Sequence, residues 1–167
     1  MPFADDLLEQ SKHLATRERK KPRQASLRRA VSTAYYALFH LLIDEATRNW
    51  KRTGQRAQLA RLFEHGQMKA ASDKRRAECE RFLNANPPTA PGATLVCMSH
   101  LHIVAHTFCR AQQRRHIADY DNAAPWTRTK ALGMIDEVDA AFHSWRAIRE
   151  DPAAQSCRLA LLGTPKG

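Results

Sequence analysis

Apolar residues recur at steps of three and four along most of the chain, which is the spacing of an amphipathic α-helix. Residues 26–49 show this most clearly, because an apolar stripe runs from Leu27 to Leu42 and Ser26 is a possible N-cap. No useful stretch alternates apolar and polar residues as a half-buried β-strand does. The predicted helices cover residues 7–14, 26–49, 55–84, 95–117 and 126–149.

Two basic segments separate the first predicted helices. Residues 17–24 (RERKKPRQ) are rich in cations and contain Pro22, so we expect a solvated connector rather than one long helix. A second polar and basic connector is expected around residues 53–54. The helix after it, over residues 55–84, has a looser apolar rhythm, and we expect it to break near residues 65–66.

Proline marks the connections in the C-terminal half. Three prolines and a glycine in NPPTAPGAT, residues 86–94, predict a loop, after which Thr94 can cap the next helix. Another loop holds Pro125. The C-terminal tail, residues 151–167, contains a short apolar piece at 158–163 (RLALLG), which is either a final helical turn or an oligomer contact.

The length of 167 residues suits one domain, which would bury roughly 70% of its unfolded surface without disulfides or a metal. We therefore expect one all-α domain over residues 1–150, an up-down bundle of four to five helices, with the tail behind it. No stretch approaches the roughly 18 to 20 apolar residues of a membrane span, and the N-terminus is acidic. The four cysteines lack a CxxC pair and are expected to be free thiols. These features predict a cytoplasmic protein.

The chain carries a net charge of +10, which is concentrated in one window. Residues 17–81 hold 17 Lys and Arg against 7 Asp and Glu, and the rest of the chain balances. Such a field attracts polyanions, because neutralising a phosphate releases a condensed counterion. The window is therefore either a nucleic-acid-binding surface or the solubilising surface of a helical protein. The candidate RNA contacts are Arg19, Lys20, Lys21, Arg23, Arg28 and Arg29.

Several enzyme classes lack their required motifs. The chain has no Gly-rich phosphate loop, no HExxH and no GxSxG, which argues against phosphate-cradling, zincin and α/β-hydrolase chemistry. His102, His106 and Cys109 are spaced so that they can lie along one helix face, as metal ligands do. The same positions lie on or beside the apolar stripe, so packing is the competing interpretation. We expect no metal and no cofactor.

A polar cluster ends the predicted helix over residues 95–117. An imidazole can act as acid or base near neutrality, and a guanidinium can stabilise the charge of a phosphorane-like transition state. Together they can cleave RNA without a metal, because the 2′-hydroxyl supplies the nucleophile. The competing interpretation is structural, since Arg115 and Asp119 are four residues apart and can pair on the helix surface. The cluster consists of Arg110, Arg114, Arg115, His116, Asp119 and Tyr120.

Two stretches together carry a family resemblance. RRAVSTAYYALFHLL at residues 28–42 and RHIADYD at residues 115–121 resemble the AYYAxFH-like and RxxADY motifs of small prokaryotic HEPN-domain proteins. FEHG at residues 63–66 is a weaker echo, and the similarity covers about residues 5–148. The resemblance implies a helical bundle that pairs as a homodimer. It further implies either a metal-independent ribonuclease of toxin–antitoxin, phage-defence or CRISPR-linked systems, or an inactive partner of a small nucleotidyltransferase.

The resemblance also assigns catalytic roles. The HEPN catalytic signature is an Arg followed, after four to six residues, by a His, and Arg110 and His116 match it. His116 would then be the general acid and base and Arg110 would stabilise the phosphate, in a site where two protomers meet. Ala111 follows Arg110, where active members often have a polar residue. Residues six apart on a straight helix lie about 240° from each other, so a shared site requires a distorted helix end or a partner chain.

The remaining aromatic residues are expected to be mainly structural. Those of the AYYAxFH-like motif lie on the most apolar helix, where core packing is favoured over base stacking. They are Tyr35, Tyr36, Phe39 and His40. Trp126 and Trp145 are candidates for the core or a dimer interface, and Tyr120 is a candidate adenylylation target by analogy with HEPN toxins regulated by a nucleotidyltransferase.

The sequence thus predicts a HEPN-type protein directed at RNA, either single-stranded RNA or tRNA. In the leading hypothesis it is a metal-independent endoribonuclease with Arg110 and His116 in a homodimer-interface site, where Arg114, Arg115, Asp119 and Tyr120 support catalysis. In the alternative it is a catalytically inactive HEPN module that binds a nucleotidyltransferase or antitoxin. A third interpretation is a helical scaffold whose charge has no ligand.

Overall fold

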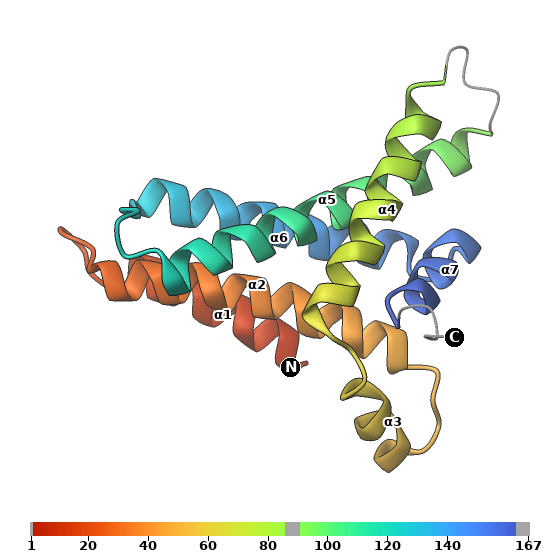
Figure 1. Ribbon diagram of the computed structural model, residues 1–167, viewed down its shortest axis with the longest axis horizontal. Coiled ribbons are helices and arrows are strands. Elements are labelled where there is room, and N and C mark those ends of the chain that lie inside the picture. The colour runs from red at the N-terminus through yellow and green to blue at the C-terminus, as the bar shows by residue number, and fades with distance from the viewer. Residues whose placement is uncertain (1, 86–90, 163–167) are drawn as a thin grey trace. The chain divides into compact units, whose positions relative to one another are not determined.

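The computed structural model describes residues 2–85 and 91–162, and within these ranges it is all helical, with no strand (Figure 1). The all-α prediction is confirmed. The helices are α1 (Phe3–Thr16), α2 (Gln24–Thr47), α3 (Thr53–Ala60), α4 (His65–Leu83), α5 (Gly92–Tyr120), α6 (Arg128–Ile148) and α7 (Pro152–Ala160).

The described ranges contain seven helices where four to five were predicted. The first extra helix arises because the stretch predicted over residues 55–84 divides into α3 and α4, with the break just before the expected position at residues 65–66. The second is α7, which the predicted tail forms with Asp151 as its N-cap: the Asp151 side chain accepts a hydrogen bond from the Ala153 amide.

Three predicted helix starts are wrong. Ser26 is not an N-cap, because α2 begins at Gln24, and the Ser26 hydroxyl instead donates to Glu18 Oε1 at 2.8 Å. Thr94 lies inside α5, which begins at Gly92, and residues 53–54 open α3 rather than forming a connector. The local sequence does not fix the first residue of a helix to better than a few positions. The loop predicted at residues 86–94 falls partly on residues 86–90, and RLALLG ends at residue 163; both lie outside the described residues.

The chain divides into two compact units. Unit 1 comprises Met1–Leu41 and Thr107–Phe142, and unit 2 comprises Leu42–His106 and His143–Gly167. The boundary falls within α2, α5 and α6, so each of these helices contributes one part to each unit.

Unit 1 is a four-helix bundle built from α1 and parts of α2, α5 and α6. Its core includes Tyr35 of α2 and Phe108 of α5, both fully buried, with ring centroids 5.7 Å apart. Burying such a side chain stabilises a fold by about 1.5–3 kcal/mol. At the surface Lys12 Nζ of α1 lies 2.9 Å from Asp139 Oδ2 of α6. The apolar stripes of these helices therefore face one another, as their spacing predicted.

Unit 2 has its own core around Trp145 of α6, which is fully buried together with Met68, Leu101 and Leu161. A buried carboxylate, Glu45 of α2, lies among arginines at the edge of this core. It forms an ion pair with Arg149 and a second one with Arg48, whose Nη1 lies 3.3 Å from Glu45 Oε2. Arg158 of α7 donates to the Glu45 carbonyl oxygen at 3.2 Å. Residues of the predicted tail therefore pack within unit 2.

The cysteines form no disulfide, as the sequence predicts. Burial raises the pKa of Cys79 to about 11 and, together with the hydrogen-bonded Asp151 carboxylate, raises the pKa of Cys97 to about 12. Burial also raises the pKa of Cys157. Since the thiolate is the nucleophile, these three thiols of unit 2 are poor nucleophiles at neutral pH.

Contrary to the expectation from the sequence, α5 has the length and apolar composition that would let a helix cross a membrane; this holds within the described ranges. A core helix of a soluble protein meets the same criterion, so this is weak evidence. The C-terminal part of α5 packs into unit 1 through the buried Phe108, Ala111 and Ala118. The observation is consistent with a soluble protein.

Candidate functional site

The two motifs that carry the family resemblance meet in unit 1. Arg115, near the C-terminal end of α5, donates from Nη2 to the Tyr36 hydroxyl oxygen on α2 at 2.8 Å. These residues are 79 positions apart in sequence. Arg115 Nε also lies 2.8 Å from Asp119 Oδ2, which confirms the predicted pair one helical turn apart. One guanidinium therefore joins the AYYAxFH-like motif to the RxxADY motif.

Three tyrosine rings surround the Arg115 guanidinium. Its central carbon lies 6.0 Å from the Tyr35 ring centroid, 5.4 Å from that of Tyr36 and 5.8 Å from that of Tyr120. Such contacts attract a cation to the ring faces. Burial lowers the pKa of Arg115, but Tyr36 and Asp119 outweigh this effect and raise that pKa above its usual value. Arg115 is therefore a fixed, permanently charged group.

Ser32 forms a further hydrogen bond between α2 and α5. The Ser32 hydroxyl donates to Asp119 Oδ2 at 3.4 Å, and Ser32 is itself buried. Burial raises the pKa of the neighbouring Tyr35 far above its usual value, so its phenol stays neutral. The Arg115 charge is thus balanced by a single carboxylate, Asp119, that α2 helps to hold.

Arg28 of α2 closes the C-terminal end of α5. Its guanidinium donates to the carbonyl oxygens of Ala118 at 2.9 Å, Asp121 at 2.8 Å and Ala124 at 2.9 Å. The last carbonyls of a helix lack partners within the helix, and a cation there complements the helix dipole. Arg28, a predicted RNA contact, is therefore engaged in fixing the backbone around the RxxADY motif.

These residues line an open pocket of about 490 Å³ on unit 1. Its lining includes Arg28, Arg29, Arg115, Tyr36, Asp119 and Tyr120. Three guanidinium groups face one carboxylate, so the pocket is cationic. Arg29 differs from the other two arginines because its side chain is exposed and makes no hydrogen bond or ion pair within the described ranges. The pocket therefore offers one fixed and one uncommitted guanidinium to an anion.

The predicted catalytic pair, Arg110 and His116, is not brought together within the chain. Both lie on α5, which continues as one helix to Tyr120. Arg110 Nη2 lies 3.5 Å from Glu137 Oε1 of α6, and Arg114 Nη1 lies 3.2 Å from Glu137 Oε2. His116 is exposed, and its ring centroid lies 4.9 Å from that of Tyr120. The helix end is not distorted, so a site that uses both residues needs a second protomer.

The basic connector of residues 17–23 presents its side chains to solvent. Arg19, Lys20, Lys21 and Arg23 are exposed. The connector is held through its backbone: Arg128 of α6 donates to the Glu18 carbonyl oxygen and, at 3.2 Å, to that of Arg19. The hydrogen bond from Ser26 lowers the pKa of Glu18, which keeps this acid ionised. The four predicted RNA contacts of the connector are therefore accessible.

The His102 and His106 rings stack with their centroids 5.6 Å apart. His102 Nε2 lies 3.2 Å from Glu80 Oε1 of α4, and the hydrogen bonds from His102 and Arg76 lower the pKa of Glu80. The part of the chain that the structure describes holds no group of three or more His, Cys, Asp or Glu side chains placed for a metal ion. The spacing of these histidines is explained by contacts within unit 2.

Sequence reasoning missed two residues of the pocket network. Tyr36 was expected in the core, but it is half-buried and its hydroxyl accepts from Arg115. Ser32 was not singled out, although it holds Asp119. The available signal was the spacing of four between Ser32 and Tyr36, which places two hydroxyl groups on one helix face.

No protein-family model matches this chain, and no match is found among curated proteins or solved structures. The class that the structure itself defines is an all-α protein whose unit 1 carries a cationic, tyrosine-lined pocket.

Proposed function

We propose that this protein binds single-stranded RNA through the cationic pocket of unit 1 and belongs to the HEPN type that its motifs resemble. One observation carries the proposal: Arg29 and Arg115 line a pocket that also exposes the Tyr120 ring. Single-stranded nucleic acids bind where cations track the phosphates and aromatic rings stack on bases. The net charge of +10 supports the same ligand.

The pocket offers a distinct role for each group. Arg115 is held in place by Tyr36 and Asp119, so it can contact a phosphate without first being ordered. Arg29 is exposed and can adapt to the path of the backbone. The Tyr120 side chain is 65% exposed, which leaves a ring face for a base. In this proposal Arg28 acts indirectly, by holding the end of α5.

Cleavage of the bound RNA is the second candidate function, and the exposure of His116 favours it. His116 follows Arg115 directly, and within the described ranges its side chain makes no hydrogen bond or ion pair and contacts the Tyr120 ring. An exposed imidazole beside a phosphate site can deprotonate a 2′-hydroxyl without a metal. Arg110 would then come from the partner of a homodimer. Such an enzyme would suit a toxin or a phage-defence effector.

An inactive HEPN module that binds a nucleotidyltransferase or antitoxin is the competing proposal. It is favoured by the ion pairs of Arg110 and Arg114 with Glu137, because both arginines then stabilise the packing of α5 on α6 and need no catalytic role. The exposed Tyr120 hydroxyl would then be open to adenylylation by the partner. RNA binding and RNA cleavage separate these proposals.

Replacing Arg29 by Glu is expected to weaken binding of a labelled oligouridine about tenfold and to reduce the salt dependence of the affinity by about one counterion. The fold should be unaffected, because the Arg29 side chain is exposed and no hydrogen bond or ion pair of it within the described ranges would be lost. Fluorescence anisotropy across a range of salt concentrations measures both quantities. The control is Lys130→Glu, which makes the same change of charge at an exposed residue of α6. Equal losses in the two variants would contradict a specific role for the pocket.

Purified protein is expected to cut cellular RNA in the presence of EDTA, and His116→Ala is expected to lose at least about a hundredfold in cleavage rate. The same variant should keep its affinity for oligouridine, because the imidazole is not needed for phosphate binding. Gel electrophoresis of the fragments and anisotropy together make the comparison. RNA that binds but stays intact with the wild-type protein would favour the inactive module.

A further inference from the structure

The segment of residues 50–62, here named the basic arm, is a second cationic surface and belongs to unit 2. Its sequence, WKRTGQRAQLARL, contains four cations and no acid. None of its residues belongs to the pocket of unit 1. The arm is therefore a separate feature, and its properties call for their own explanation.

The helix of the arm, α3, has no core that would hold it. It is eight residues long, none of its residues is buried, and it contains Gly54. Helices of this length are marginal in water without tertiary packing. Hydrogen bonds tie it to the preceding Trp50: Arg56 Nη2 donates to the Trp50 carbonyl oxygen at 2.8 Å, and Trp50 Nε1 donates to Gln55 Oε1 at 3.1 Å. Leu59 and Ala60 are only half-buried, so hydrophobic burial holds this helix weakly.

Three cations of the arm differ from most cations of the neighbouring α4, which form ion pairs. On α4, Lys69 pairs with Asp73, and Arg75 and Arg76 pair with glutamates one turn away. On the arm, the exposed side chains of Lys51, Arg52 and Arg61 make no hydrogen bond or ion pair within the described ranges. Lys69, Arg75 and Arg76 are thus neutralised within α4, whereas Lys51, Arg52 and Arg61 of the arm are available to a ligand.

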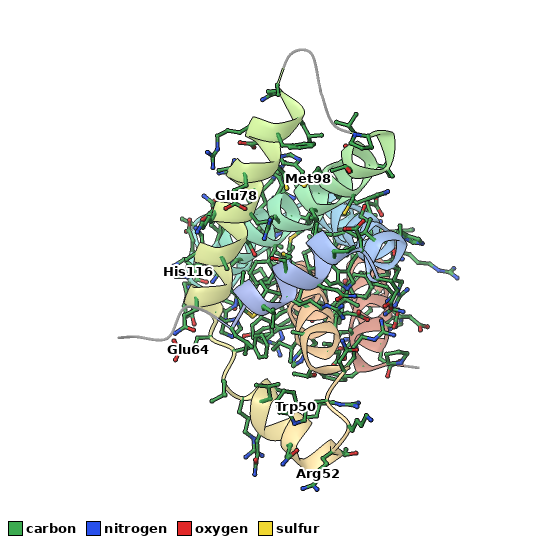
Figure 2. All side chains as sticks on the ribbon, turned by 90° about the vertical axis from the view of Figure 1, so that its right-hand side faces the viewer. Trp50, Arg52, Glu64, Glu78, Met98 and His116 are labelled. Atoms are coloured by element: carbon green, nitrogen blue, oxygen red, sulfur yellow. The ribbon has the colours of Figure 1, made fainter. Side chains whose placement is uncertain are left out.

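An exposed aromatic ring lies among these cations. Trp50 is 51% exposed, although tryptophan is normally well buried, and it lies with Arg52 at the start of the arm (Figure 2). Its indole N–H donates to Gln55, so a stacked partner would not have to satisfy this group. An exposed tryptophan followed in sequence by two uncompensated cations, Lys51 and Arg52, combines the aromatic ring and the positive charge that bind single strands.

We propose that the basic arm is a second contact for single-stranded nucleic acid, in which the Trp50 indole stacks on a base and Lys51, Arg52 and Arg61 contact phosphates. This proposal rests on the proposed RNA binding and extends it to unit 2. An anionic membrane fits the arm less well. Membrane-surface helices bury a continuous apolar face, whereas the exposed apolar residues Trp50 and Leu62 lie outside α3, at its two ends.

The chain provides a direct reporter for this contact. It has three tryptophans, of which Trp126 and Trp145 are buried, so the solvent-exposed part of the emission comes from Trp50. Titration of the full-length protein with unlabelled oligouridine is expected to quench this exposed emission. Trp50→Phe should remove the quenched component and retain the buried emission. The same titration with anionic phospholipid vesicles and with an acidic peptide tests the two other partners.

Anisotropy of labelled oligouridine provides the matched test. The triple variant Lys51→Glu, Arg52→Glu, Arg61→Glu is expected to bind at least about tenfold more weakly than wild type. The control, Lys74→Glu, Arg81→Glu, Lys130→Glu, reverses three exposed cations outside the arm and should lose less than about threefold. None of the six side chains takes part in an ion pair, and both variants should fold, as circular dichroism will verify.

The outcomes separate the arm from the pocket. If wild-type protein binds oligouridine without quenching of Trp50, and both triple variants lose affinity equally, the arm proposal is overturned while RNA binding stands. If vesicles or the acidic peptide quench Trp50 and oligouridine does not, the arm serves another partner and the proposal is again overturned. If wild-type protein does not bind oligouridine by either readout, both the proposed function and the arm contact fail.

Discussion

Replacing Arg115 by Ala is expected to reduce RNA affinity by at least about tenfold and to lower the free energy of unfolding by about 2 kcal/mol. The substitution removes the hydrogen bond to Tyr36 and the ion pair with Asp119, and it leaves that carboxylate in the pocket without its cation. The pocket then loses a fixed positive charge and keeps a negative one. Anisotropy with oligouridine and urea denaturation followed by circular dichroism measure the two effects.

Arg115→Lys separates charge from geometry. Lysine keeps the positive charge, but its single ammonium group cannot place separate nitrogens beside Tyr36 and Asp119 as the guanidinium does. We expect this variant to recover most of the salt dependence of RNA binding and about half of the lost stability. Unchanged RNA affinity in a folded Arg115→Ala protein would remove the pocket from the proposed function.

Replacing Glu45 by Ala is expected to lower the free energy of unfolding by about 1.5–3 kcal/mol, because hydrogen-bonded ion pairs of a buried carboxylate are lost. The Glu45 side chain is only 7% exposed, and its loss leaves Arg149 without the carboxylate that balances it. Arg48 loses one of its two acidic partners as well. Urea denaturation of the variant and the wild type gives the difference.

The control for Glu45 is Glu150→Ala. Glu150 pairs with the same Arg48 at 3.2 Å, but its side chain is 73% exposed, so the expected loss is below about 1 kcal/mol. If both substitutions lowered the free energy of unfolding by the same amount, burial would not determine how much these ion pairs stabilise the protein. RNA affinity should be unchanged in both, since neither residue lies in the pocket or on the arm.

The helices were predictable because their signal is local. The stripe from Leu27 to Leu42 repeats at steps of three and four, and α2 formed along it. Helix ends were less predictable, since Ser26 and Thr94 both look like caps but lie inside helices. Their hydroxyl groups fit several local arrangements, and only the neighbouring chain, such as Glu18 for Ser26, selects one of them.

The sequence by itself determined the all-α class, the concentration of positive charge and the Arg115–Asp119 pair, because each depends on composition or on residues within about one helical turn. Only the tertiary structure decided that Arg115 donates to Tyr36 and that Arg28 donates to the carbonyl oxygens at the end of α5. It also decided that Arg110 pairs with Glu137 and not with a group beside His116. These contacts join different helices. Which helix faces meet depends on how whole surfaces pack, and no spacing along one helix encodes that choice.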